Sequence, residues 1–247
     1  MRWTAWSPTR LVIQAAASHD MSVLKFVAHS RLVLTIAIRR GWLPAARYTN
    51  LRDVRWCDRL GFLDIEWRSY SFRAHLTAVR STRPLVTVAR DVECSHQLPM
   101  VLDQAEELAQ YADYVVVVPK DPSLARCLRE VIPKRFLLGY SVPTRYGATS
   151  LQPAAFSGRR VPLLGGRPDA QRRLADLLNV VSIDCNRFTL DARYGDYFDG
   201  EGFRPHPRGG YRRCLADSVR NIDKLWRCYT VASPLGLPSA QDCRRGT

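Results

Sequence analysis

The chain has no apolar run that approaches the ~20 residues of a membrane-spanning helix, and it contains no CxxC or CxC pair. Its seven cysteines are scattered along 247 residues. An odd and widely spaced set argues against a disulfide framework and against a local zinc site. A reducing cytoplasm is therefore the expected compartment. Residues 1–20 hold only a short apolar patch, which is too weak for a secretory signal.

Lysine is scarce, and almost all of the 37 basic residues are arginine. Acidic residues number 23, so the chain has a net charge of +14. The planar guanidinium group suits phosphate recognition better than an ammonium group does. Arginine in place of lysine can reflect genomic base composition, but this does not account for the positive excess. A polyanionic partner, foremost nucleic acid, is therefore favoured.

Short apolar runs alternate with amphipathic stretches from residue 23 onward. The valine-rich run at 114–120 is typical of a buried strand in a parallel sheet. Strands are expected over residues 23–28, 47–50, 62–67, 85–91, 114–120, 136–142, 161–166 and 180–184. Helices are expected over residues 31–40, 72–81, 98–111, 123–131, 169–178 and 211–226.

Strands that alternate with helices pair in parallel through right-handed crossovers. The pattern predicts an α/β fold of the compact (β/α)8 type, a TIM barrel, which is typically ~250 residues long. The competing open doubly wound sheet lacks its usual GxGxxG after the first strand. The barrel is expected over residues 21–226, after an N-terminal extension (1–20) and before a C-terminal tail (227–247).

Acids at the ends of three expected strands are the leading candidates for chemistry, because the carboxyl ends of barrel strands face the catalytic mouth. Asp184 is placed to act as a nucleophile at an anomeric carbon. Asp91 is a hydrogen-bond acceptor suited to the N–H edge of a purine, and Asp64 is a candidate general base. Each acid also has a structural interpretation: Asp184 as a cap of the next turn, and Asp91 as an N-cap or the partner of Arg90. Asp64 shares its face of the strand with Glu66, so either acid can be redundant with the other.

Other residues at the same end of the barrel indicate contacts with substrate or phosphate. Lys120, Ser141 and Gly165 fall at strand ends. The Gly165-Gly166 pair allows a ligand to approach the backbone just before a helix begins. Arg145 lies in a loop suited to phosphate contact and base stacking, although a structured turn with a solvated arginine explains that loop equally well.

The segment SIDCNRFTLDARYG (182–195) resembles the FDCVLPTRxGRxG motif of the tRNA-guanine transglycosylase superfamily, with matches at Asp184, Cys185, Thr189, Arg193 and Gly195. VPLLGGRPD is similar to the family's YLxGVGxPxD segment, VARDVEC to its MxFDEC motif, and GYSVPT to its GYxxGG loop. The Asp of FLDIEW matches that of the DSGGF motif. The resemblance covers residues 23–226 and is greatest to the shorter phage and bacterial 7-deazaguanine DNA transglycosylases.

The chain also departs from the family pattern. The zinc-binding CxCxxC…H insertion is absent, Pro143-Thr144 replaces the second glycine pair of the GYxxGG loop, and Lys120 replaces the glutamine of the IVQG strand end. The zinc subdomain helps to dock tRNA in the full-length enzymes, so its absence favours DNA as the substrate. The missing insertion predicts that no zinc is bound. The resemblance implies no other cofactor, because one glycosidic bond is exchanged for another.

The resemblance implies that Asp184 is the nucleophile that expels guanine from a nucleotide and that Asp64 is the general base. A 7-deazaguanine base such as preQ0 is the implied co-substrate, and a cytoplasm, that of the host for a phage protein, is the implied location. The residues expected to bind the base are Asp91, Lys120, Ser141, Gly165 and Gly166. The residues expected to contact the nucleic acid are Arg145, Arg187 and Arg193.

Three other functions stay open at this point. One is a transglycosylase that acts on tRNA. Another is a barrel enzyme for a small phosphorylated substrate, with Gly165–Arg167 as the phosphate site. The last is a non-catalytic nucleic-acid-binding barrel in which the acids are structural.

Overall fold

The computed structural model describes residues 22–144, 147–232 and 235. Its strands are β1 (Leu24–Val27), β2 (Leu43–Arg47), β3 (Phe62–Asp64), β4 (Val86–Val88), β5 (Tyr114–Val117), β6 (Leu137–Leu138), β7 (Tyr140–Ser141), β8 (Val161–Leu164), β9 (Val180–Asp184), β10 (Asp196–Phe198) and β11 (Phe203–Pro205). Its α-helices are α2 (Arg31–Ile38), α3 (Phe72–Thr82), α4 (Leu98–Ala109), α5 (Leu128–Val131), α6 (Pro168–Leu174), α7 (Arg187–Ala192) and α8 (Tyr211–Trp226). Short 3-10 helices are η1 (Arg52–Val54), η2 (Ser95–Gln97), η3 (Pro122–Arg126) and η4 (Pro153–Phe156).

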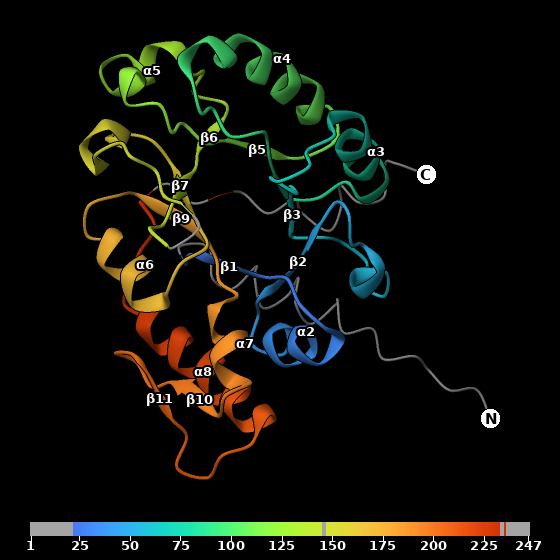
Figure 1. Ribbon diagram of the computed structural model, residues 1–247, viewed down its shortest axis with the longest axis vertical. Coiled ribbons are helices and arrows are strands. Elements are labelled where there is room, and N and C mark those ends of the chain that lie inside the picture. The colour runs from blue at the N-terminus through green and yellow to red at the C-terminus, as the bar shows by residue number, and fades with distance from the viewer. Residues whose placement is uncertain (1–21, 145–146, 233–234, 236–247) are drawn as a thin grey trace, which may run out of the picture.

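The strands β1 to β9 form one parallel barrel with helices around it (Figure 1). Their order is β6-β5-β4-β3-β2-β1-β9-β8-β7. Only Gly139 separates β6 from β7, so these two are segments of one strand and the ring is closed. The nine named strands therefore make eight barrel strands, and the predicted (β/α)8 TIM barrel is confirmed.

Gly139 lies at the interruption of the sixth barrel strand, and a larger residue does not fit there. A Cβ at this position would lie 2.7 Å from Val116 Cγ1 and 2.8 Å from Val118 Cγ2. The Gly139 N–H donates to the carbonyl of Val117 at 2.9 Å. The strand therefore stays attached to β5 across the interruption.

The predicted second strand, at residues 47–50, is wrong, because β2 runs over Leu43–Arg47. Its sequence, LPAAR, contains residues that are depleted in strands. Pro44 has no N–H to donate, but its carbonyl accepts from the N–H of Gly61 at 2.8 Å. Pairing with β1 and β3 on either side places this segment in the barrel in spite of its composition.

Two expectations for the helices also need correction. The helix expected over 123–131 is the 3-10 helix η3 followed by the short α5, and the one expected over 169–178 ends at Leu174. Helix α7 and the antiparallel hairpin β10–β11 were not predicted. The hairpin is held to α8 by buried polar bonds: Ser218 Oγ accepts from the Phe198 N–H, and the Asn221 amide donates to the Phe198 carbonyl, each at 2.9 Å.

The segment predicted as a C-terminal tail begins by packing on the barrel. Val231 is fully buried, and the Tyr229 hydroxyl accepts from the N–H of Val180, the first residue of β9, at 2.8 Å. The predicted extension at residues 1–20 lies outside the described residues. Within the described part of the chain, no helix is both long enough and apolar enough to cross a membrane.

Candidate active site

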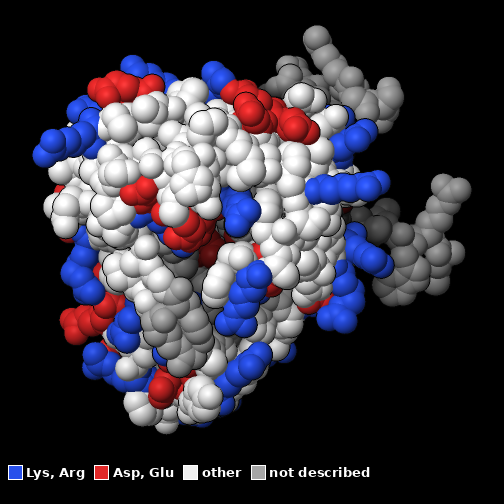
Figure 2. Space-filling view, turned by 45° about the horizontal axis from the view of Figure 1, so that its top comes forward, with Lys and Arg blue, Asp and Glu red and all other residues white. Residues whose placement is uncertain are grey.

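A pocket of about 540 Å³ lies at the carboxyl ends of β1, β2, β3 and β9. Both predicted catalytic acids, Asp64 and Asp184, line it, and we call it the acid pocket. Its other lining residues are Ala28, His29, Ser30, Ala45, Ala46, Arg47, Thr49, Asn50, Asp53, Val54, Phe62 and Asn186. Figure 2 shows one face of the molecule, on which Asp and Glu atoms lie in a recess near the middle of the view with Lys and Arg side chains beside it.

Asp184 is the last residue of β9, and its side chain is held by a neighbour two residues on. The Asn186 amide donates to Asp184 Oδ1 at 2.9 Å, and Asn186 Oδ1 accepts from the N–H of Ala28 at 2.8 Å. This chain of bonds ties the carboxyl group to the end of β1. One carboxyl oxygen is engaged by Asn186, which fixes the direction of the other.

Gln171, which is fully buried on α6, braces the backbone behind this carboxyl group. Its amide nitrogen donates to the carbonyls of Gly165 at 2.7 Å and Asp184 at 2.8 Å. The ends of β8 and β9 are thereby joined through one side chain. These hydrogen bonds to the backbone limit the motion of Asp184.

Asp64 ends β3 and pairs in register with Arg47 of β2. Its Oδ1 accepts from the N–H of Ile65 at 2.8 Å. Arg47, which also lines the pocket, forms an ion pair with Glu66 at 3.0 Å. Glu66 thus offsets part of the charge of Arg47 and does not itself line the pocket.

Two buried aromatic residues lie on the same strand as one of these acids or next to the other in the sheet. Phe26 of β1 is the register partner of Asp184, and Phe62 of β3 precedes Asp64 by two residues and so shares its face of the strand. The two rings stack with centroids 5.4 Å apart. Apolar neighbours of this kind disfavour ionised carboxyl groups.

Burial is the main reason why the pKa of Asp184 is raised to about 7, and the negative charge of Asp64 adds to the effect. The hydrogen bond from Asn186 and the charge of Arg47 act in the opposite direction. Burial also raises the pKa of Asp64 to about 6, against the hydrogen bond from Ile65. The two acids therefore titrate near neutral pH, which is the range in which a carboxyl group exchanges protons most effectively.

Asp91 follows β4, the neighbour of β3 in the barrel, and its charge contributes to the raised pKa of Asp64. Its carboxylate is bound by Lys120 at 2.6 Å, and Lys120 also contacts Glu93 at 3.1 Å. Burial raises the pKa of Asp91, although the hydrogen bond from Lys120 opposes the shift. The structure thus joins two of the predicted base-binding residues to each other, and their role toward a base stays a prediction.

The remaining predicted base-binding residues, Ser141, Gly165 and Gly166, belong to β7 and the end of β8 and do not line the acid pocket. Gly166 has φ of +86°, and a Cβ there would lie 2.4 Å from Val142 Cγ1. Gly165 has φ of +66° with open space around its missing Cβ. Close packing explains the glycine at 166 without a ligand, and a substrate role for these residues stays a prediction.

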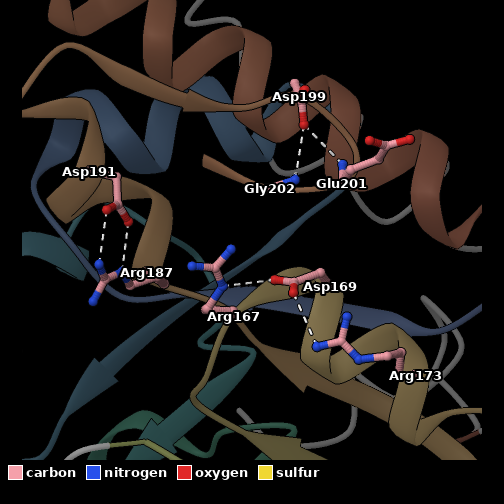
Figure 3. Close-up of polar contacts among 8 residues, drawn as sticks. All are labelled: Arg167, Asp169, Arg173, Arg187, Asp191, Asp199, Glu201 and Gly202. Atoms are coloured by element: carbon pink, nitrogen blue, oxygen red, sulfur yellow. Dashed lines mark hydrogen bonds and ion pairs between the residues drawn. The ribbon is translucent and has the colours of Figure 1, made fainter. Parts of the chain in front are cut away.

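Of the predicted phosphate-binding arginines, Arg145 lies outside the described residues. Arg187 directs its guanidinium to Asp191 of the same helix through bonds of 2.6 and 2.9 Å (Figure 3). Arg193 is exposed and lies close enough to His29 of the acid pocket to help lower the pKa of that imidazole, an effect due first to burial. The charge of Arg193 therefore reaches the pocket.

Arg167 follows the glycine pair and links the barrel to the hairpin. It forms an ion pair with Asp169 at 3.0 Å, which in turn contacts Arg173 (Figure 3). Its guanidinium also lies over the ring of Phe203, 5.4 Å from the centroid. These contacts engage Arg167 within the protein.

Several residues of the acid pocket were missed by the sequence analysis. Arg47 was assigned to the start of the wrong strand, and His29 and Asp53 carried no motif. Asn186 follows Asp184 by two residues, which is the spacing of a side-chain turn and was the one available signal.

Among the described residues, no group of three or more His, Cys, Asp or Glu side chains is arranged to hold a metal ion. The six described cysteines are all free. The expectation that no zinc is bound stays a prediction.

The profile of DUF6610, a family of unknown function, matches residues 37–227. No curated protein matches the chain. Among solved structures, the chain is similar to the YdjI aldolase from Escherichia coli K12, with a TM-score of 0.51 and 12% sequence identity over 88% of this chain and 95% of that one. At this identity the likeness shows the fold alone.

Proposed function

The chain belongs to the DUF6610 family of unknown function, and we propose that it is a base-exchange transglycosylase that replaces guanine in DNA by a 7-deazaguanine base. The observation that carries the proposal is the meeting of Asp64 and Asp184 in one pocket at the carboxyl-end mouth of the barrel. These two acids are 120 positions apart in the sequence, and both have a raised pKa. Such a pair suits a double displacement, in which one acid bonds to carbon and the other moves a proton.

In the first half of the reaction, an Asp184 carboxylate oxygen attacks C1′ of the target nucleotide. The C1′–N9 bond breaks with its electron pair on guanine, and Asp64 in its acid form gives a proton to the departing base. The product is a glycosyl ester of Asp184. Because the pKa of both acids is raised, to about 6 for Asp64 and about 7 for Asp184, the pair holds a proton near neutral pH. The reaction starts from the less populated form, in which Asp64 holds that proton and Asp184 is ionised.

In the second half, the 7-deazaguanine base enters the pocket and loses its N9 proton to Asp64. Its N9 attacks C1′ from the face that guanine left, and the ester bond breaks to regenerate the Asp184 carboxylate. Two inversions at C1′ give overall retention. The proton that Asp64 gave is returned, so the exchange needs no ATP and no redox cofactor.

The basic surface supports a nucleic-acid substrate. The net charge is +14, while the acid pocket itself contains three carboxyl groups, those of Asp53, Asp64 and Asp184. The target nucleotide must leave the base stack to reach such a recessed acid, which costs a few kcal/mol. Contacts between arginine and phosphate offset this cost and weaken with salt.

The test is to trap the ester. The full chain is incubated with a duplex DNA without free base and then denatured, and the adduct is digested and located by mass spectrometry. We expect the sugar on Asp184, no adduct with Asp184→Asn, and normal yield with the matched control Asp103→Asn, an exposed acid on α4.

Labelled preQ0 is then supplied with duplex DNA or with tRNA. Incorporation into DNA supports the proposal as stated. Incorporation into tRNA alone would assign the enzyme to tRNA, and no incorporation into either, with no adduct, would contradict the proposal.

A further inference from the structure

Helices α2 and α8 pack against each other on the outside of the barrel (Figure 1). Between them lies a second hollow, of about 620 Å³, which we call the α2–α8 groove. Its lining residues are Ile36, Arg39, Arg40, Arg212, Ala216 and Asp223. Half of these residues are arginines and only one is acidic.

The acid of the groove is already neutralised from several sides. Asp223 accepts from the indole N–H of Trp42 at 2.8 Å and forms ion pairs with Lys25 at 3.3 Å and Arg40 at 3.7 Å. With two cations and a donor on one carboxylate, this acid has little negative charge left to offset another arginine.

The other two arginines of the groove carry uncompensated charge. Arg39 directly follows α2 and Arg212 lies in the first turn of α8, and both are exposed. Over the part of the chain that the structure describes, neither has a carboxylate within ion-pair distance. Exposed guanidinium groups spaced along two helices form a track suited to a chain of phosphates, whereas a single small anion is better held in an enclosed site.

Helix α2 connects the groove to the acid pocket. His29 and Ser30, just before its first residue, line the acid pocket, and Arg39 follows its last residue. At 1.5 Å a residue, the eight residues of α2 span about 12 Å. This length is the rise of about three to four base pairs of duplex DNA.

We propose that the α2–α8 groove binds the DNA phosphate backbone about three to four base pairs from the nucleotide that enters the acid pocket. Arg39 and Arg212 contact phosphates, and the DNA strand passes Arg193 beside the acid pocket. This inference rests on the proposed function only in taking DNA as the polyanion. It assigns to the groove the binding energy that holds the duplex while one nucleotide is extruded.

The experiment measures binding and not catalysis. A fluorescent 30-base-pair duplex is titrated with the full chain at several salt concentrations, each protein carrying Asp184→Asn so that no adduct forms. Arg39→Glu with Arg212→Glu is expected to raise Kd by at least tenfold. The plot of log association constant against log salt has a negative slope. Arg39→Gln with Arg212→Gln is expected to make this slope shallower by about 2, close to 0.9 for each lost phosphate contact.

The matched control is Arg126→Glu with Arg129→Glu, a pair of exposed arginines at the opposite end of the molecule, on η3 and α5 (Figure 1). It makes the same change in net charge and is expected to change Kd less than threefold. Thermal melts of all variants check that the fold is kept. Equal losses in the two pairs, or no DNA binding by the parent protein, would overturn the inference, whereas failure of base exchange with a groove-specific loss of binding would overturn only the proposed function.

Discussion

At the scale of single residues, the acid pocket contains the carboxyl groups of Asp64 and Asp184 beside stacked aromatic rings. One amide and one arginine oppose the rise in the pKa of Asp184. The amide of Asn186 and the charge of Arg47 favour the ionised form of Asp184, but burial and Asp64 outweigh them. The negative charge of Asp64 thus makes ionisation of Asp184 less favourable. The same coupling makes Asp184 a stronger base, and hence a better nucleophile once ionised.

This arrangement has a consequence for stability that does not depend on the reaction. Since the pKa of Asp184 is higher in the folded protein than in the unfolded chain, the folded state holds a proton that the unfolded state has lost. Stability therefore falls as pH rises from about 4 to about 7. Asparagine has the same shape, can still accept the hydrogen bond from Asn186, and carries no charge.

We expect Asp184→Asn to be more stable than the parent by about 1–2 kcal/mol at pH 8.5, since one pKa unit corresponds to about 1.4 kcal/mol and solvent in the pocket reduces the full effect. At pH 5 the gain should be much smaller. Urea unfolding at the two pH values measures the difference. A variant that is less stable at pH 8.5, or equally changed at both pH values, would show that Asp184 is not buried as described.

At the scale of elements, the loop after β8 contains two glycines with different surroundings. Gly166 is closely packed against Val142, whereas Gly165 has open space beside it. Any L-residue at Gly165 or Gly166 has to adopt a positive φ, which costs about 1–2 kcal/mol. A side chain at 166 would in addition overlap Val142, at 2.4 and 2.6 Å from its atoms, and overpacking of this kind costs about 1–3 kcal/mol.

Gly166→Ala is therefore expected to lower the free energy of unfolding by about 2–5 kcal/mol, and Gly165→Ala by only the smaller first amount. Chemical denaturation of both variants separates strain from overlap, because the two share the backbone cost. Equal losses would mean that Val142 moves aside freely.

The strands that the sequence predicts well are those whose composition agrees with their place in the barrel. The valine run of β5 and the acid-terminated β9 show this, because both are rich in β-branched residues. Strand β2 was misplaced since Pro44, Ala45 and Ala46 are poor strand formers, and only its two neighbours hold it in the sheet. The hairpin β10–β11 depends on Ser218 and Asn221 of the later helix α8, a contact that no local pattern reveals.

The residues of the candidate site also include some that the sequence predicts and some that it does not. Asp64 and Asp184 were predictable because each ends an apolar run and barrel topology brings such ends together. Arg47 was not, because its role follows from the register between β2 and β3. Lys120 and Asp91 were both named, but not as partners, since nothing in the sequence indicates that adjacent strands would pair their charges.

At the scale of the whole molecule, the acid pocket and the α2–α8 groove divide opposite charges between two places. The carboxyl groups lie at the mouth, where burial raises their pKa, and the uncompensated arginines lie on the outer helices. Because these arginines are separate from the acid pocket, they attract a polyanion without neutralising the carboxyl groups. The spacing of the two sites along α2 lets one ligand engage both.

The whole molecule also includes more of the C-terminal segment than the sequence indicated. The Tyr229 hydroxyl accepts from the Val180 N–H at 2.8 Å and donates to the Leu178 carbonyl at 3.3 Å, so it connects the segment after α8 to the start of β9. We expect Tyr229→Phe to destabilise the fold by about 1–2 kcal/mol, because buried backbone groups lose a partner. Tyr194→Phe, at a residue that is 78% exposed, is the control and should change stability by less than about 0.5 kcal/mol. Thermal or urea unfolding measures both, and equal effects of the two substitutions would show that this segment is not part of the folded barrel.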